Sequence, residues 1–351
     1  MKLIIRNAIF AGAFVFCFKA FAFPGKEKDI ITVKKDPQQN KVEILANGQK
    51  FTEFIYPDSM EKPVLYPIYA SDGELITRGF PVAPREHDPV DHPHHIGLWL
   101  NYENVNGLDF WNNSFAIPAD KKNKYGWIKT NKIIETKDGK TGVLTYAASW
   151  QNQQKEELLQ EKTSFYFSAE GSIRIIDRIT TLTATRDVSF PDVKDGMLGL
   201  RVTHELELPS KDNKEFIDNK GNITKVKPSD DLVTGNYLTA NNKHGDSAWG
   251  TRSPWCMLYG KKGADTISIA IIDHPGNVGY PTYWHARGYG LFAANPLGQK
   301  VFSNGKEQLN YSLNKGQSVT FRYRVVINAG KERLSGKEMK KLSDQFQSAY
   351  K

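Results

Sequence analysis

Four of the eight histidines in this 351-residue chain fall within nine residues, at His87, His92, His94 and His95. Two carboxylates, Asp88 and Asp91, lie among them. Imidazole is the side chain that exchanges a proton near neutral pH, and it is also the commonest metal ligand in proteins. The density of this run therefore predicts either proton-transfer chemistry or metal binding.

An extended backbone from Asp91 to His95 would point His92 and His94 to one face and His95 to the other. Because two imidazoles on one face can reach one ion, one interpretation is that His92 and His94 hold a divalent metal, with a third ligand from elsewhere in the chain. Two other interpretations stay open. The histidines line a site without metal, with His94 as general acid or base and His95 on the substrate, or they only hydrogen-bond within a crowded loop.

A second group of candidate residues lies in Tyr283–Gly290, shortly after His274. On a strand, alternate side chains of this segment would put two phenols, an imidazole and a guanidinium on one face. Such a face suits a pocket for a polar ring with an anionic group, since arginine binds carboxylates in a bidentate fork. We predict His285 as a general acid or base and four neighbours as substrate-binding: His274, Trp284, Arg287 and Tyr289. The alternative is a solvated face with Arg287 in a salt bridge.

A third pattern is the alternation of polar and apolar residues from Gly199 to Leu208. It predicts a strand whose polar face carries Glu205, a candidate carboxylate base, while His204 lies on the apolar side and fits a core position. Arg78, an isolated cation before the histidine run, is a further candidate for substrate binding.

The elements that must position these residues are mostly strands. β-Branched and aromatic residues recur at period two, as half-buried antiparallel strands require, most clearly in Ile128–Glu135, Gly142–Trp150, Lys162–Ser168 and Ser172–Thr183. The polar segment Ser210–Asn242 predicts an excursion or lid over one end of the sheets. A capping box at Ser335–Glu338 starts a helix whose Met339, Leu342 and Phe346 share a face. The predicted fold class is all-β, one large antiparallel β-sandwich with a short C-terminal helix.

The first residues have the features of a secretory signal peptide. A charged start, an apolar run and Ala20-Phe21-Ala22 predict a signal peptide over residues 1–23 and a single β-sandwich domain over residues 24–351. The mature chain would keep one cysteine, Cys256, so it would have no internal disulfide. We therefore expect a periplasmic or secreted protein with no membrane span after the signal peptide is removed.

The charge pattern argues against nucleic acid as a partner. The formal net charge is +8, but lysines and arginines are scattered and form no basic stripe. The chain also lacks a Gly-x-Ser-x-Gly elbow, a Walker loop and a dinucleotide fingerprint. The expected partner is a small-molecule or oligosaccharide substrate, because the aromatic content of 12% leaves rings to spare for stacking on sugars.

Five motifs in order carry a family resemblance: Asp91–Trp99, Asn106–Trp111, Asp273–Pro275, Tyr283–Gly290 and Asn295–Gly298. Together they resemble a family of secreted bacterial proteins of unknown function that are often labelled "methane oxygenase PmoA". The resemblance covers about Pro67 to Gly298. It implies a β-supersandwich similar to galactose mutarotase and related sugar-active enzymes.

The leading hypothesis is a periplasmic carbohydrate-active enzyme that cleaves or isomerises a sugar derivative. His94 or His285 and Glu205 would supply acid–base catalysis, Arg287 would hold a carboxylate, and a metal, if present, would polarise a substrate oxygen. The alternative is a non-catalytic glycan-binding protein, in which the aromatics bind and the histidines only donate hydrogen bonds. A copper-dependent oxidase is the third hypothesis.

Overall fold

The computed structural model describes residues 29–218, 220–226 and 232–350. The predicted signal peptide, residues 1–23, lies outside the described residues. Within the described part of the chain, no helix combines the length and apolar character that crossing a membrane requires.

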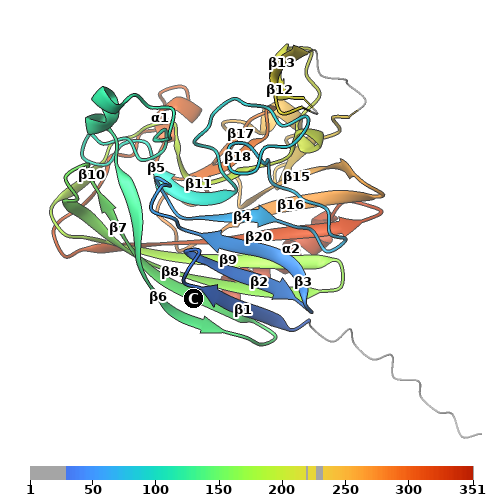
Figure 1. Cartoon of the computed structure of the whole chain (residues 1–351), viewed down its shortest axis with the longest axis horizontal. Coiled ribbons are helices and arrows are strands. Elements are labelled where there is room, and N and C mark those ends of the chain that lie inside the picture. Colours follow the sequence, from blue (N-terminus) through green and yellow to red (C-terminus); the bar gives the residue numbers. More distant parts are fainter. Residues whose placement is uncertain (1–28, 219, 227–231, 351) are drawn as a thin grey trace, which may run out of the picture.

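Two eight-stranded antiparallel sheets make up most of the molecule (Figure 1). The strands of the first sheet, in spatial order, are β1 (Ile31–Asp36), β2 (Lys41–Ala46), β3 (Gln49–Ile55), β4 (Val64–Ile68), β5 (Leu98–Tyr102), β11 (Gly196–Arg201), β18 (Leu291–Asn295) and β17 (Tyr283–Ala286). Those of the second sheet are β14 (Asn236–Thr239), β15 (Trp255–Lys262), β16 (Asp265–Asp273), β20 (Ser318–Gly330), β9 (Ile173–Ala184), β8 (Glu157–Glu170), β7 (Gly142–Gln151) and β6 (Trp127–Lys137).

The shorter elements connect and flank these sheets. They are β10 (Val188–Phe190) with β19 (Tyr311–Leu313), the hairpin β12 (Lys214–Ile217) with β13 (Ile223–Val226), the helix α1 (Gln299–Phe302), and the 3-10 helices η1 (Ala119–Lys124), η2 (His204–Leu206) and η3 (Gly245–Ala248).

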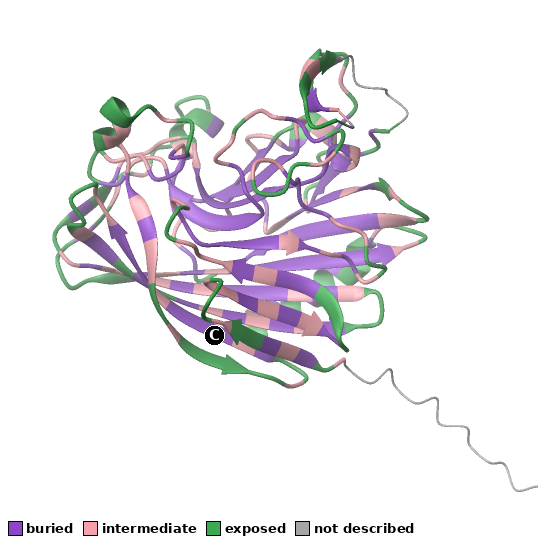
Figure 2. Ribbon diagram, viewed as in Figure 1, coloured by how far each residue is buried: buried purple, intermediate pink, exposed green. Residues whose placement is uncertain are grey.

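The inner faces of the two sheets enclose the main core. Strand β2 shows why, since its side chains alternate between half-buried and buried along the strand, as one face of a sandwich requires. The largest hydrophobic cluster combines residues of both sheets, among them Phe54, Leu198, Phe165 and Val325. Figure 2 shows buried residues throughout both sheets and exposed residues in the C-terminal half of β6. The predicted antiparallel β-sandwich is confirmed.

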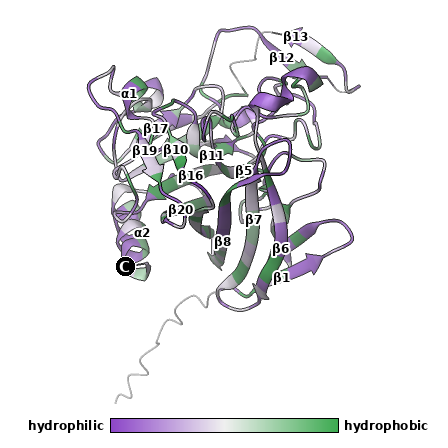
Figure 3. Ribbon diagram, turned by 90° about the vertical axis from the view of Figure 1, so that its left-hand side faces the viewer, coloured by the Kyte–Doolittle hydropathy of each residue, from purple (hydrophilic) through white to green (hydrophobic). Residues whose placement is uncertain are grey.

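The outer face of the second sheet is covered by the C-terminal helix α2 (Gly336–Ala349). Ser335 and Glu338 form the expected capping box, and Met339, Leu342 and Phe346 pack with residues of β15, β16 and β20. Figure 3 shows the helix lying against this sheet. The predicted helix and its buried face are confirmed.

The outer face of the first sheet is covered differently. Its apolar cluster includes Trp99 of β5, Trp111 and Ala293 of β18, and no helix of the described residues contributes to that cluster. Strand pairing aligns Gly199 of β11 with Trp99 on one side and with Ala293 on the other. Ala293 is aligned in turn with His285 of β17. This face therefore brings β5, β11, β18 and β17 together, although they are far apart in the sequence.

The predicted excursion over Ser210–Asn242 is confirmed for the hairpin β12–β13 but is wrong at its end, because Asn236–Thr239 forms strand β14 of the second sheet. The hairpin β12–β13 stands at one end of the molecule (Figure 1). Residues 87–90 pair with its first strand: the His87 amide donates to the Ile217 carbonyl at 2.9 Å and the Val90 amide to the Glu215 carbonyl at 3.1 Å. The hairpin is thus held directly against the segment that leads into the histidine run.

Candidate functional site

The histidine run forms a tight turn. His92 has a left-handed backbone conformation, with φ of 46°, and the His95 amide donates to the His92 carbonyl at 3.0 Å. The prediction of an extended backbone is therefore wrong here. Because the chain turns, the rings of His92 and His95 lie on the same side, with their centroids 4.9 Å apart and their planes nearly parallel.

The same turn places His92 against the second group of candidate residues. Its ring stacks on that of Tyr289, with 4.9 Å between centroids and 3° between planes. His95 stacks in turn on Trp99 at 5.3 Å. Four rings from distant parts of the sequence thus form one aromatic run, which we call the ring stack: Tyr289, His92, His95 and Trp99.

Two guanidinium groups lie against the Tyr289 end of the ring stack. Arg201 and Arg287 are 5.1 and 5.5 Å from the Tyr289 ring centroid, a placement favoured by cation–π attraction. Burial raises the pKa of the Tyr289 hydroxyl, so the phenol keeps its proton at neutral pH. Tyr289 can therefore donate a proton or a hydrogen bond to a substrate.

Asp91 joins the turn to the sheet. Its carboxylate accepts hydrogen bonds from Arg201 at 2.7 and 3.0 Å, from Arg78 at 2.9 Å and from Nδ1 of His92 at 2.5 Å. Burial alone would raise the pKa of Asp91, but the His92 bond and the Arg201 charge outweigh it and hold the pKa well below its usual range. The ionised carboxylate only accepts, so Nδ1 of His92 carries the hydrogen and neutral His92 has its lone pair on Nε2.

Arg78, predicted to bind substrate, lies buried beneath the turn with 1% of its surface exposed. Besides Asp91, its guanidinium donates to four backbone carbonyls at 2.6 to 3.1 Å, those of Pro89, Asp91, His92 and His95. In the structure, Arg78 therefore holds the histidine turn in its shape through these hydrogen bonds.

A second buried carboxylate supports Arg201 from behind. Glu207 is fully buried and lies 3.5 Å from Arg201, 3.0 Å from Nδ1 of His204 and 2.6 Å from Nζ of Lys214. Because Lys214 belongs to β12, this cluster ties the hairpin to the sheet. His204 is buried, with 4% of its surface exposed, and its side chain also lines a small pocket.

His285 lies on the same outer face, at the β17 edge of the first sheet, and is 2% exposed. Its Nδ1 is 3.4 Å from Oδ1 of Asp195. Burial, with the positive charges of Lys194 and Arg287, lowers the pKa of His285 to about 3, and burial raises the pKa of Asp195. His285 is therefore a neutral imidazole at physiological pH, beside a carboxyl group that holds its proton more tightly than usual.

His94 lies beside the ring stack, 4.3 Å from the His95 ring and 5.7 Å from the His92 ring. Burial and the nearby ammonium of Lys62 lower the pKa of His94 to about 2. Lys62 is itself buried, donates to the His94 carbonyl at 2.8 Å and lies 5.5 Å from the Trp99 ring. His94 is thus held neutral, beside the two histidine rings of the stack.

Two cavities adjoin the Tyr289 end. One has a volume of about 440 Å³ and includes Arg287 in its wall, and the other, of about 350 Å³, includes Asp91 and Arg201. Three residues line both cavities: Asp212, Lys214 and Tyr289. Both volumes fall within the range of small-molecule sites, and Tyr289 marks the boundary between the two.

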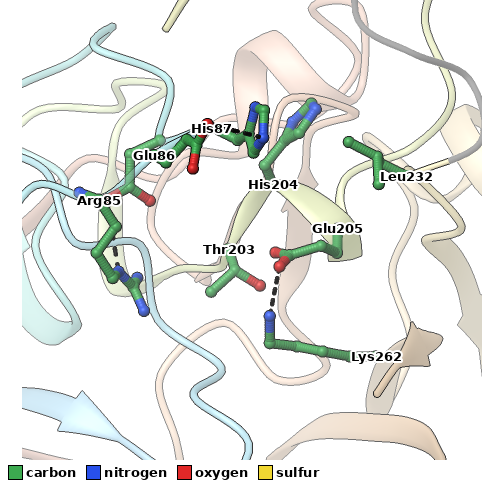
Figure 4. Close-up of a pocket in the computed structure, with 9 residues that line it drawn as sticks. Arg85, Glu86, His87, Thr203, His204, Glu205, Leu232 and Lys262 are labelled. Atoms are coloured by element: carbon green, nitrogen blue, oxygen red, sulfur yellow. Dashed lines mark hydrogen bonds and ion pairs between the residues drawn. The ribbon is translucent and has the colours of Figure 1, made fainter. Parts of the chain in front are cut away.

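Glu205, the predicted carboxylate base, lies elsewhere. The predicted strand ends at Arg201 and residues His204–Leu206 form the 3-10 helix η2, so the expected alternation fails beyond β11. Figure 4 shows Glu205 in a separate pocket of about 130 Å³, with its Oε1 accepting from Nζ of Lys262 at 2.5 Å. Burial would raise the pKa of Glu205, but Lys262 outweighs it and lowers the pKa. The carboxylate is already paired with a cation.

Trp284 and His274, both predicted to bind substrate, also lie away from the ring stack. Trp284 is fully buried in the main core, where its Nε1 donates to Oγ of Ser253 at 2.8 Å. The ring of His274 lies 5.3 Å from that of Phe346 in α2, on the second sheet. The structure thus brings six of the predicted residues together: His92, His94, His95, His285, Arg287 and Tyr289.

The residues present do not fit the predicted metal site. In the part of the chain that the structure describes, no three histidine, cysteine, aspartate or glutamate side chains come close enough together to hold an ion. His92 also directs its Nδ1 to Asp91. We therefore derive no catalytic step through a metal.

Sequence reasoning missed several residues that shape this site. The sequence marks Asp91 only as a neighbour of the histidines, and Arg201 only as one polar residue of an alternating segment. Lys62 and Asp195 were not singled out. Spacing gives no signal for Lys62 or Asp195, because each lies just before a strand, β4 or β11, and reaches this face only once the first sheet has assembled. Asp91 had a local signal, since a carboxylate beside a histidine is a common orienting partner.

Comparisons with known proteins identify the family of this chain but do not identify an activity. An α-galactosidase of family GH36, AgaB from Geobacillus stearothermophilus, has 12% identity and a TM-score of 0.39, with 87% of this chain covered. The heparan sulfate lyase HepC (a mutant) from Pedobacter heparinus has 10% identity and a TM-score of 0.33, with 83% covered. The chain spans 42% and 34% of those two proteins.

A third structure, the Slr1438 protein from Synechocystis sp. PCC 6803, has 10% identity and a TM-score of 0.33, with 88% of this chain and 98% of that one covered. These similarities are too remote to bear on the chemistry of the site. No curated protein matches the sequence. A family model described as a family of unknown function, DUF6807, matches residues 41–344. Because this match covers most of the sequence, the protein belongs to the DUF6807 family.

Proposed function

We propose that the protein is a carbohydrate-active enzyme that acts on a sugar derivative by general acid–base catalysis, with His92 as the base and Tyr289 as the acid. The observation that carries this proposal is the placement of His92 between Asp91, which fixes its Nδ1 hydrogen, and Tyr289, on which its ring stacks. A base and an acid in contact can serve two proton transfers of one reaction.

An elimination fits these residues best. Nε2 of His92 would accept a proton from a carbon next to a carboxylate or carbonyl of the substrate. The electron pair of that C–H bond would form a carbon–carbon double bond, the C–O bond to the leaving group would break, and the leaving oxygen would take the proton of the Tyr289 hydroxyl. The guanidinium of Arg287, near the Tyr289 ring, would offset the negative charge that develops on the substrate.

The make-up of the cavities supports a sugar as substrate. Both are lined by charged and polar side chains beside the Tyr289 ring. A sugar presents apolar C–H faces that pack on aromatic rings and hydroxyls that need hydrogen-bond partners, so it requires both kinds of surface. The predicted signal peptide supports export, and we place this activity in the periplasm or outside the cell.

Substitution of His92 tests the proposal. Purified protein would be incubated with acidic and neutral oligosaccharides, and new unsaturated products would be followed by ultraviolet absorbance and mass spectrometry. We expect His92→Ala to lower kcat by a factor on the order of 10² to 10⁴, as loss of a general base does. The matched control is His87→Ala, in the same run but exposed and paired only with Glu86, which should keep wild-type activity.

Two results would contradict this function. Undiminished turnover by His92→Ala would remove His92 from the chemistry. Binding of sugars without turnover of any of them by the wild-type protein would instead establish the alternative, a non-catalytic glycan-binding protein.

A further inference from the structure

The larger cavity next to Tyr289 contains an unpaired cation. Arg287 is exposed, and among the described residues its guanidinium makes no hydrogen bond and no ion pair; its contact is with the Tyr289 ring. The other basic residue of this cavity, Lys214, is already held by Glu207 at 2.6 Å. Arg287 therefore has its full set of donors available for an anionic group.

The same cavity contains two carboxylates that are not paired with Arg287. Asp212 and Asp246 both line it and both are exposed. In the described part of the chain, neither carboxylate takes part in an ion pair or accepts a hydrogen bond from a side chain. Asp246 belongs to the 3-10 helix η3 and lies near Gly288, where a Cβ would be 3.4 Å from its Oδ1. Free carboxylates of this kind accept hydrogen bonds from hydroxyl groups.

An aromatic ring completes the cavity. Trp249 lines the wall directly after η3, and its ring packs edge to face on Phe302 with 5.4 Å between centroids. The Trp249 amide also donates to the Asp246 carbonyl at 3.2 Å. The indole is thus fixed beside the carboxylate, on a different element from Arg287 and Tyr289.

We propose that this cavity is a binding subsite for a uronate unit, a sugar ring that carries a carboxylate. Arg287 binds the carboxylate in a bidentate fork, Asp246 and Asp212 accept from the ring hydroxyls, and Trp249 packs against the ring. A neutral sugar would leave Arg287 without an anion, and a simple carboxylic acid would leave the two aspartates and Trp249 without partners. The set of groups therefore selects a ligand that has both features.

The inference rests on the proposed function in one respect. Tyr289 lines this cavity and the neighbouring one, so a uronate bound here would present an adjoining unit, or its own reactive carbon, to His92. The proposal therefore names an acidic glycan as the class of substrate. A sulfated sugar shares the anionic chemistry, and the test must separate it from a uronate.

Calorimetric binding to the intact mature protein tests the subsite directly. The probes are D-glucuronate, D-galacturonate, D-glucose, D-galactose, glucose 6-sulfate and inorganic sulfate. We expect at least one uronate to bind about tenfold or more tightly than its neutral counterpart, because a hydrogen-bonded charge pair contributes that much. Arg287→Met should abolish this preference, and Trp249→Ala should weaken uronate and neutral sugar together. The matched control is Arg186→Met, an exposed arginine paired weakly with Glu156 at 3.8 Å.

The outcomes separate the subsite from the catalytic proposal. His92→Ala should bind the uronate with wild-type affinity, so loss of turnover with retained uronate binding leaves the subsite intact whatever the reaction is. Equal affinity for uronates and neutral sugars, or an unchanged preference in Arg287→Met, would overturn the subsite even if sugar turnover were found. Tighter binding of glucose 6-sulfate or free sulfate than of either uronate would overturn its assignment to a carboxylate.

Discussion

Asp91 is the residue on which the other side chains of the site converge. It accepts from two arginines of different segments and from His92 at the same time. Arg201, which donates two hydrogen bonds to Asp91, is fully buried, whereas the Asp91 side chain is 35% exposed to solvent. Loss of Asp91 would leave the buried Arg201 guanidinium with Glu207, at 3.5 Å, as the carboxylate beside it, and would free the His92 ring to rotate.

We predict that Asp91→Asn loses about 3 kcal/mol of stability at pH 7, the lower end for breaking a buried ion pair. The folded protein holds the pKa of Asp91 below its unfolded value of about 4, so the stabilisation is complete above that value and is lost as pH falls further. Urea unfolding from pH 7 down to about 2 should therefore show the gap between wild type and variant closing below about pH 4. The matched control, the exposed Asp344→Asn, should have almost the same stability as the wild type. A stability difference for Asp91→Asn that does not change with pH would contradict the proposed role of the Asp91 charge.

At the scale of elements, the segment from His87 to His95 is the most informative, because it has no regular secondary structure and yet carries the site. Two devices hold it. Arg78 donates to its carbonyls from below, and β12 pairs with its first residues. Its order thus depends on one buried side chain and one hairpin, and we expect it to loosen before the sandwich does.

We predict that Arg78→Met increases amide hydrogen exchange across residues 87–95 by a factor of about 10 or more while α2 keeps its protection, since local opening costs less than global unfolding. Four carbonyls and Asp91 lose a donor, and loss of one such donor is worth about 1 to 3 kcal/mol. Mass spectrometry of exchanged peptides measures both regions in one sample. Unchanged exchange at 87–95 would show that the segment does not depend on Arg78.

Local patterns predicted the elements that depend on local causes. Burial alternates with period two along most of β8 and β9, and α2 begins at its capping box. Alternation along a strand also means that His285 and Trp284 point to opposite faces. The structure has Trp284 in the main core accordingly, so the prediction that both residues line one site is wrong. The histidine run failed as a strand because its backbone turns at His92, to which Arg78 and Asp91 both bond.

The meeting of the two candidate segments could not be predicted from spacing. His92 reaches Tyr289 because β5, β11, β18 and β17 are neighbours in the first sheet, and that order follows from packing between residues far apart in the chain. Glu205 shows the reverse case, since β11 ends at Arg201 and the chain turns Glu205 to Lys262. The residue types indicate the kind of chemistry, but only the strand order decides which of these residues meet in one site.

At the scale of the whole molecule, the sandwich contains a buried polar cluster between its sheets. Glu161 accepts from Tyr146 at 2.6 Å, from Trp150 at 2.8 Å and from Arg178 at 2.9 Å. Glu161 and Arg178 are each 2% exposed. Every partner here is a side chain of β7, β8 or β9, so the cluster fixes how these three strands lie within the core.

We predict that Arg178→Met destabilises the protein by about 3 to 5 kcal/mol, because it leaves Glu161 buried without its cation. The double variant Glu161→Gln with Arg178→Met should lose less than the sum of the single changes, since the remaining amide is neutral. Urea unfolding at pH 7 measures all three. The matched control is Arg186→Met, for which we expect less than about 0.5 kcal/mol. If the loss of stability in the double variant equalled the sum of the two single losses, the coupling between Glu161 and Arg178 would be contradicted.

The pairing of β12 with residues 87–90 has a consequence for how such proteins diversify. The hairpin stands outside the sandwich (Figure 1), yet Asp212 and Lys214 border both cavities. Insertions or deletions in this excursion would reshape the cavity wall while the two sheets keep their cores. Evolution can therefore change which ligand the cavities accept by editing a peripheral hairpin, and homologues with the same sandwich and the same Asp91–His92 pair should differ most in length there.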